Sequence, residues 1–237
     1  MSLTVERWEL PSLPVTGTTD RFPVRHIYCI GRNYAEHARE MGQDPEREPP
    51  FFFCKQADAV LAEGGDLPYP PGTQNFQHEI ELVVAIHKRT ERVGAGEALG
   101  CVFGYAVGLD MTRRDLQQRA KEKGHPWDFG KSFAHAAPIG PVHPVTQVGH
   151  VAAGEIRLQV NGEVRQRGRL EDMIWSVPEA IAFLSEYYTL LPGDLIMTGT
   201  PAGVAAVVPG DRLVGGIEAL GELRVTITPP REQARTH

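Results

Sequence analysis

Hydrophobic residues occupy every second position in several short segments of the chain, and this two-residue period predicts β-strands. The clearest segment is 78–84, HEIELVV, in which apolar side chains alternate with Glu79 and Glu81. Side chains two apart on a strand lie on the same face, so these two carboxylates should point the same way, roughly 6–7 Å apart at the backbone. A solvent-facing polar strand face would give the same pattern.

Similar apolar runs predict the other strands. The expected strands cover residues 26–30, 51–55, 102–110, 155–160, 163–166, 195–198, 212–214 and 222–228. Asn161-Gly162 lies between two alternating runs, which is the strongest short signal for a β-hairpin.

Helices are predicted where capping residues precede an apolar stripe. Ser176 and Glu179 fit a capping box at the start of one helix, with Pro178 in its first turn. A shorter helix is expected over residues 35–41, where Gly42 would end it.

A third helix is expected over residues 113–123. Thr112 and Asp115 fit a capping box at its start, and Gly124 would end it. Residues 128–133 are expected to form a loop or a short strand.

Glycine and proline are frequent, at 25 and 19 residues, and this composition suits strands and turns better than a helical protein. The predicted class is therefore mainly β with peripheral helices (α+β). We expect an N-terminal arm over residues 1–24, a catalytic domain over 25–229 and a C-terminal tail over 230–237.

Charge and cysteine content argue against several classes of protein. The net charge of -6 at pH 7 argues against a nucleic-acid partner. No apolar run approaches the length of a membrane span, and residues 1–8 lack the pattern of a signal peptide. Cys29, Cys54 and Cys101 form no C-x-x-C pair, which predicts reduced, mostly buried thiols in a cytoplasmic protein.

A third carboxylate, Asp110, ends the apolar run 102–110 just before the third predicted helix. Carboxylates held together resist ionisation unless a cation lies between them. Glu79, Glu81 and Asp110 would offer three oxygen ligands, which suits Mg²⁺ with positions left for water and a chelating substrate. Zn²⁺ prefers nitrogen and sulfur ligands. Asp110 taken alone is equally consistent with a helix cap.

Four more residues are candidates for chemistry. His37 and Glu40 are three apart in a predicted helix, so they share a face, as a general base and its orienting carboxylate require; an exposed surface pair is the alternative. Lys55 ends an apolar strand, where it is either an anion ligand or only a charge at the end of the strand. Thr200 lies in the glycine-rich loop 199–204, which is either a carboxylate-binding loop or only a tight turn.

As a set, these residues resemble the fumarylacetoacetate hydrolase family. The matching motifs are Gly31-Arg32-Asn33-Tyr34, His37 to Glu40, Phe53-Cys54-Lys55, His78-Glu79-Ile80-Glu81, Leu109-Asp110-Met111-Thr112, Lys131-Ser132-Phe133 and Thr198-Gly199-Thr200-Pro201. The length is similar to that of the acylpyruvase branch, and segments 21–25 and 44–50 resemble bacterial fumarylpyruvate hydrolases. Gln56 departs from the family pattern, which has proline after the lysine.

The resemblance implies a mixed β-roll or sandwich, a Mg²⁺ or Mn²⁺ ion, a homodimer and a small oxo-acid substrate. It assigns the metal ligands to Glu79, Glu81 and Asp110, and a catalytic dyad on a lid helix to His37 and Glu40. It further implies an active-site lysine and several substrate contacts, namely Lys131, Arg32, Arg114, Gln117 and Thr200.

The implied reaction is hydrolysis of a carbon–carbon bond in an acylpyruvate, most simply fumarylpyruvate to fumarate and pyruvate in aromatic (gentisate) degradation. The dyad would deprotonate water, Lys131 would neutralise the oxyanion, and the metal would act as a Lewis acid. The alternative is an oxaloacetate decarboxylase, or an isomerase or decarboxylase of unsaturated oxo-dioates, on the same metal site. A non-enzymatic binding protein on this fold is a further alternative.

Overall fold

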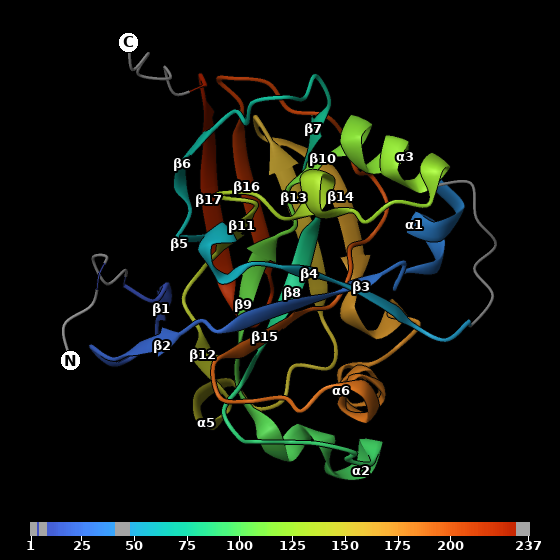
Figure 1. Cartoon of the computed structure of the whole chain (residues 1–237). Helices are drawn as coiled ribbons and strands as arrows, with labels where there is room; N and C mark the ends of the chain where they lie inside the picture. The colour runs from blue at the N-terminus through green and yellow to red at the C-terminus, as the bar shows by residue number, and fades with distance from the viewer. Residues whose placement is uncertain (1–3, 5–8, 41–47, 231–237) are drawn as a thin grey trace.

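Two β-sheets packed against each other form the frame of the molecule (Figure 1). The computed structural model describes residue 4 and residues 9–40 and 48–230. Within them, the larger sheet has the order β4-β3-β15-β8-β9-β11-β5, with β12 also paired to β9, and the smaller has the order β14-β13-β16-β17-β6. The chain is therefore mostly β.

The strands of the larger sheet are β3 (His26–Gly31), β4 (Phe51–Lys55), β5 (Val60–Ala62), β8 (Ile80–Ile86), β9 (Val102–Leu109), β11 (Ala137–Ile139), β12 (His143–Pro144) and β15 (Asp194–Met197). Those of the smaller sheet are β6 (Gly65–Pro68), β13 (Glu155–Val160), β14 (Glu163–Arg169), β16 (Arg212–Ile217) and β17 (Gly221–Thr228). Two short pairs are formed by β1 (Ser12–Pro14) with β2 (Arg21–Pro23) and by β7 (Phe76–Gln77) with β10 (Thr112–Arg113). Both sheets are mixed, because β3 with β15, β5 with β11 and β6 with β17 run parallel.

Helices lie around the edges of the sheets (Figure 1). They are α1 (Ala35–Glu40), α2 (Ala95–Ala98), α3 (Arg114–Lys123), α4 (Asp128–Lys131), α5 (Val145–Val148) and α6 (Val177–Tyr187), with short 3₁₀ turns at Ala57–Ala59, Leu99–Cys101 and Leu170–Asp172. No helix in the described part of the chain is both long and apolar enough to span a bilayer.

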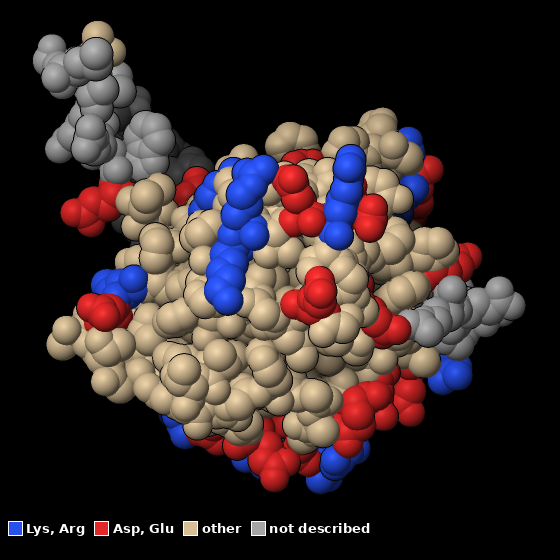
Figure 2. All heavy atoms as spheres, turned by 90° about the horizontal axis from the view of Figure 1, so that it is seen from below, with Lys and Arg blue, Asp and Glu red and all other residues tan. Residues whose placement is uncertain are grey.

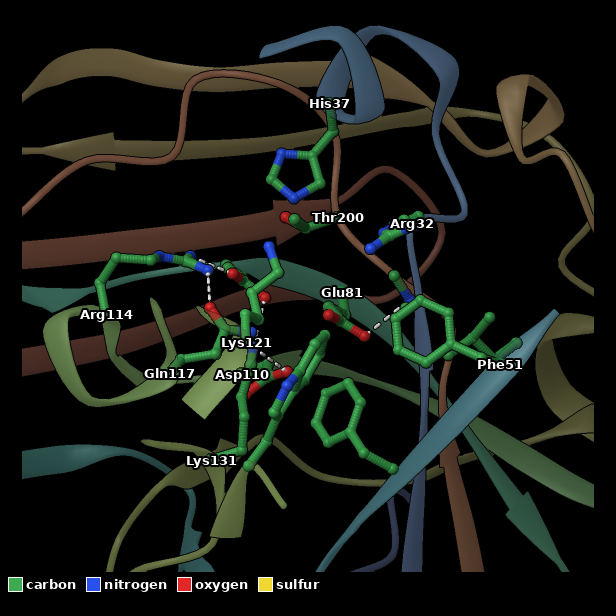
Figure 3. A pocket seen from close by; sticks show the side chains of 16 residues that line it. Arg32, His37, Phe51, Glu81, Asp110, Arg114, Gln117, Lys121, Lys131 and Thr200 are labelled. Carbon is green, nitrogen blue, oxygen red and sulfur yellow. Dashed lines mark hydrogen bonds and ion pairs between the residues drawn. The ribbon is translucent and has the colours of Figure 1, made fainter. Parts of the chain in front are cut away.

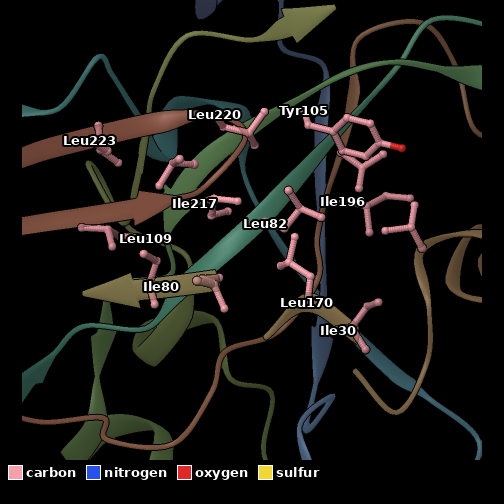
Figure 4. Packing of buried hydrophobic residues seen from close by; sticks show 14 of the residues in the cluster. Ile30, Ile80, Leu82, Tyr105, Leu109, Leu170, Ile196, Ile217, Leu220 and Leu223 are labelled. Carbon is pink, nitrogen blue, oxygen red and sulfur yellow. The ribbon is translucent and has the colours of Figure 1, made fainter. Parts of the chain in front are cut away.

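Strand β8 is buried along its whole length because both of its faces are covered. Ile80 and Leu82 face the smaller sheet, in the main core that Figure 4 shows. Val83 faces the opposite side, in a second core under the β1–β2 pair. By the two-residue period of a strand, Glu81 shares the face of Val83, which explains how a carboxylate becomes buried there.

Several local predictions are confirmed. Asn161 and Gly162 join β13 to β14, both with positive φ, 54° and 85°. Ser176 and Glu179 form the predicted capping box of α6. Gly124 ends α3 in the left-handed conformation.

Two local predictions are wrong. Thr112 does not cap α3; it pairs with Gln77 in the β7–β10 pair, and the carboxylate of Asp115 instead accepts a hydrogen bond from the hydroxyl of Thr73. Residues 128–131 form the short helix α4 rather than a loop or a strand.

The predicted terminal segments are described only in part. β1 and β2 bury Leu13 and Phe22 in the second core, while residues 1–3 and 5–8 of the predicted arm lie outside the described residues. The tail prediction falls on 230–237, of which only residue 230 is described. The division at residues 25 and 229 stays a prediction.

The surface seen in Figure 2 carries charges of both signs. Lys and Arg side chains stand beside Asp and Glu side chains around a broad uncharged area, and no continuous basic stripe crosses this face.

Gly104 tests how tightly β12 packs on β9. A Cβ added to Gly104 would lie 2.3 Å from the backbone oxygen of His143, so Gly104→Ala must push two strands apart. We expect a loss of about 1–3 kcal/mol in the free energy of unfolding, measured by urea denaturation. Gly100→Ala is the control, because its Cβ would meet nothing within 4 Å. Equal stability of the two variants would contradict this packing.

Candidate active site

Three carboxylates meet where β8 begins and β9 ends. One oxygen from each of Glu79, Glu81 and Asp110 lies within 4.8 Å of the others. The backbone brings them together, because the Asp110 N–H donates to the Glu79 carbonyl at 2.8 Å and Glu81 lies opposite Gly108 on β9. All three residues are buried, with exposed fractions of 5%, 2% and 1%.

Three cations balance the charge of the cluster. The Lys131 Nζ lies 2.8 Å from Glu79 Oε2 and 2.7 Å from Asp110 Oδ2. Arg114 pairs with the other oxygen of Glu79, and the Lys55 Nζ lies 2.7 Å from Asp110 Oδ1. Burial raises the pKa of Glu79, but the charges of Lys131 and Arg114 outweigh burial and hold that pKa below its ordinary value.

Glu81 differs from the other two carboxylates. Its Oε2 accepts the backbone N–H of Gly199 at 2.7 Å, and no ion pair to it occurs within the described residues. Burial, followed by the charges of Asp110 and Glu79, raises the pKa of Glu81 well above its ordinary value. A divalent cation beside Glu81 would remove this penalty, and three carboxylates are the hard oxygen donors that Mg²⁺ and Mn²⁺ prefer. The residues therefore fit a divalent metal.

The predicted dyad lies beside the cluster. His37 projects from α1 towards Thr200 and the carboxylates (Figure 3). Its Nδ1 lies 3.3 Å from Glu40 Oε2, and the oxygens of Glu40 also accept the Gly203 N–H at 3.1 and 3.2 Å. A carboxylate only accepts, so Nδ1 carries the proton in this pair and Nε2 is left to accept one.

Asn33 holds the turn from β3 into α1. Its amide Nδ2 donates to the carbonyls of Trp175 and Thr198 at 2.9 and 2.8 Å, and its Oδ1 accepts the Trp175 N–H at 2.7 Å. These bonds fix the start of α1 against the end of β15. The predicted helix end at 41–42 and most of the loop at 44–50 lie outside the described residues.

Gln166 is a site residue that the sequence reasoning missed. It is fully buried on β14, and its Nε2 donates to Thr200 Oγ1 at 2.7 Å and to the Pro201 carbonyl at 2.8 Å. Its Oε1 accepts the Ile80 N–H at 3.1 Å and lies 2.8 Å from His78 Nδ1. One side chain thus fixes the Thr200 loop to the strand that carries the glutamates.

The structure places the predicted substrate contacts at different depths. Arg32 is exposed at the mouth of the pocket, and Thr200 lines its wall. Arg114 and Gln117 are buried and bond to each other at 2.6 Å, so both support Glu79 as well as lining the pocket. Lys55 lies against Asp110, is not part of the pocket lining, and donates to the Met111 carbonyl at 3.3 Å. Its contact with substrate stays a prediction.

The pocket has further walls that the sequence analysis did not assign to the site. They are formed by Phe51, Phe53, Lys121 and Trp127, of which only Phe53 lies in a matching motif. Phe51 and Phe53 are two apart on β4 and so share a face. Burial, followed by the charges of Arg32 and Arg114, lowers the pKa of Lys121.

Comparison with known proteins places the chain in a family. Residues 26–228 match the family profile described as fumarylacetoacetate (FAA) hydrolase C-terminal. The chain belongs to the fumarylacetoacetate hydrolase family. The resemblance inferred from the motifs is confirmed.

Relatives in this family include enzymes of two activities. A fumarylpyruvate hydrolase from Ralstonia sp is 45% identical over 186 residues, which are 78% of this chain and 96% of that protein. A mitochondrial oxaloacetate tautomerase from Rattus norvegicus is 40% identical over 203 residues, 86% of this chain and 91% of that protein.

One solved structure also shares the fold. It is the crystal structure of fumarylpyruvate hydrolase from Pseudomonas aeruginosa in complex with Mn²⁺ and pyruvate. It is 52% identical, with a TM-score of 0.94, and the match covers 96% of this chain and all (100%) of that one. The predicted fold class is confirmed. The Mn²⁺ in this relative is consistent with a divalent-metal site at the carboxylate cluster.

Glu81→Gln tests the metal site. The amide keeps the size of the side chain but loses the charge, so we expect the affinity for Mn²⁺ to fall at least tenfold, about 1.4 kcal/mol. Titration calorimetry on the metal-stripped protein measures it, with the exposed Glu97→Gln on α2 as control. Unaltered affinity would remove Glu81 from the ligand set.

The same measurement has a pH dependence. The raised pKa of Glu81 means that its proton persists to higher pH than for an ordinary glutamate. A metal must displace that proton, so wild-type affinity should decline as pH falls through this raised pKa. The decline should be shallower in Glu81→Gln.

Proposed function

We propose that this protein hydrolyses the carbon–carbon bond of acylpyruvates, with fumarylpyruvate, cleaved to fumarate and pyruvate, as its substrate. One observation carries the proposal: a buried three-carboxylate cluster and a His37–Glu40 pair line one pocket. A relative 52% identical is a fumarylpyruvate hydrolase, in complex with Mn²⁺ and pyruvate. Such a role suits a step in aromatic (gentisate) degradation.

We propose Mg²⁺ or Mn²⁺ as the cofactor, held by Glu79, Glu81 and Asp110. The carboxylate and 2-oxo oxygens of the substrate would chelate the bound ion, which would supply Lewis-acid stabilisation of the charge that develops there. Lys55 pairs with Asp110 and Arg114 pairs with Glu79, and these ion pairs fix the two carboxylates in place.

The dyad activates the water that attacks the substrate. His37 Nε2 takes a proton from water, while Glu40 holds the ring through Nδ1. The hydroxide adds to the distal carbonyl carbon. The bond between that carbon and the methylene carbon then breaks, its electron pair goes to the pyruvate fragment, and the proton held by His37 returns to the methylene carbon. One water is consumed, and the new carboxyl group releases one proton as it ionises to fumarate.

Lys131 has a donor to spare for this reaction. An ammonium has three N–H donors, and two of them bond to Glu79 and Asp110. We assign the third to the oxyanion that forms at the attacked carbonyl. Arg32, Arg114, Gln117 and Thr200 are the proposed contacts with substrate.

A second candidate function uses the same site. The rat relative, 40% identical, is an oxaloacetate tautomerase, and oxaloacetate could bind the metal through the same carboxylate and 2-oxo oxygens. Decarboxylation, or isomerisation of an unsaturated oxo-dioate, would need the carboxylate cluster but no attacking water. The His37–Glu40 pair favours hydrolysis over decarboxylation, which needs no base.

We also propose a cytoplasmic homodimer. Membership of the family supports the dimer. The three cysteines are all free thiols, of which Cys29 and Cys101 are buried, and free thiols are typical of a reducing compartment.

His37→Ala tests the role of the dyad. We expect kcat for fumarylpyruvate to fall by about 10²–10⁴-fold, because general base catalysis is lost, while Mn²⁺ affinity stays within about twofold. His125→Ala is the control, since His125 is exposed and does not line the pocket. Wild-type turnover by His37→Ala would rule out the dyad mechanism.

A further inference from the structure

Two cations at the mouth of the pocket are not used by the carboxylate cluster. Glu79 and Asp110 are already paired with Lys55, Lys131 and Arg114. In the described part of the chain, no carboxylate forms an ion pair with Arg32 or Lys121, which we call the cationic rim. Among the described residues, a protein with a net charge of -6 thus places two cations that form no ion pair at the opening of this pocket.

Three aromatic rings line the pocket next to the rim. Phe51 and Trp127 meet edge to face at 5.4 Å between ring centroids, and Phe53 lies 5.6 Å from Trp127. We call these rings the aromatic slot. Each ring has two flexible torsions at most and packs against another ring, so the slot presents rigid, flat, apolar walls.

The rim is attached to the slot. The Arg32 guanidinium lies 5.2 Å from the centroid of the Phe51 ring, and the Lys121 Nζ lies 5.7 Å from that of Trp127. Stacking on the rings keeps both cations directed over the slot without neutralising them. Figure 3 shows Arg32 above Phe51 and Lys121 in front of the carboxylates.

The pocket therefore has two anion-binding ends joined by an apolar wall. The carboxylate cluster, with its metal, takes the pyruvyl end of the proposed substrate. The remaining acyl chain must pass the rings and reach the opening, where Arg32 and Lys121 offer positive charge. A neutral alkyl end would leave the rim unpaired, whereas a carboxylate would pair with it.

We propose that the aromatic slot and the cationic rim select acylpyruvates whose distal acyl group is flat, conjugated and terminated by a carboxylate. This inference rests on the proposed acylpyruvate hydrolysis and adds the residues that decide among acylpyruvates. Arg32 and Lys121 are specificity-determining residues that bind the distal carboxylate and take no part in the bond cleavage.

The test compares two substrates that share the pyruvyl end. Fumarylpyruvate has a conjugated –CH=CH–COO⁻ group on its distal carbonyl, and acetylpyruvate has a neutral methyl group in place of that whole group. We expect the ratio of kcat/KM for the two, fumarylpyruvate over acetylpyruvate, to fall at least tenfold in Lys121→Met and in Arg32→Gln, mainly through KM for fumarylpyruvate. Lys121→Arg, which keeps the charge, should retain most of the wild-type ratio.

Lys123→Met is the matched control. Lys123 is exposed on the same helix, two residues after Lys121, and does not line this pocket. Lys123→Met therefore removes the same charge from the protein without changing the pocket. The ratio should stay within about twofold of wild type. An equal fall in Lys123→Met would show a long-range charge effect and would overturn the assignment, as would an unchanged ratio in both Lys121→Met and Arg32→Gln.

A binding measurement separates failure of this inference from failure of the proposed function. If the wild-type protein cleaved both substrates with equal kcat/KM, the proposed selectivity would be refuted and the proposed hydrolase function would stand. If neither substrate were cleaved, the proposed function would fail, and fumarate binding would still test the rim. Calorimetry should then show fumarate affinity at least tenfold weaker in Lys121→Met than in Lys123→Met; equal affinities would refute the rim.

Discussion

Burial of three carboxylates at one point is the constraint on which the rest of this structure depends. Each buried charge costs several kcal/mol unless it is paired. The chain meets that cost with Lys55, Lys131 and Arg114, which come from separate segments and converge on Glu79 and Asp110. Glu81 is compensated least, because it accepts one backbone N–H and forms no ion pair within the described residues, and a divalent cation beside it would offset the cost of burying its charge.

The two sheets place the chemistry by dividing the strand faces between core and site. One face of β8 packs against the smaller sheet. The other face carries Glu81, which lines the pocket, and Val83, which packs in the second core. Polar side chains tie the site's loops to this frame, as Asn33 does for the start of α1 and Gln166 for the Thr200 loop.

The sequence predicts the parts of this site that depend on local spacing. The shared face of Glu79 and Glu81, the His37–Glu40 pair and the turn at 161–162 all follow from periods of two to four residues. Contacts between distant segments carry no such signal: Gln166 meets His78 across 88 positions in the chain. Likewise Asp115 is bonded to Thr73, 42 positions away, and so does not complete the capping box that its neighbours suggest.

The most direct test of the account is turnover of fumarylpyruvate by the metal-stripped protein, with and without added Mg²⁺ or Mn²⁺. Loss of the diketo absorbance and release of pyruvate and fumarate would be followed together. We expect negligible turnover without metal, and release of the two products in equal amounts once metal is added. Metal-independent cleavage, or no cleavage of fumarylpyruvate by a metal-loaded protein that decarboxylates oxaloacetate, would contradict it.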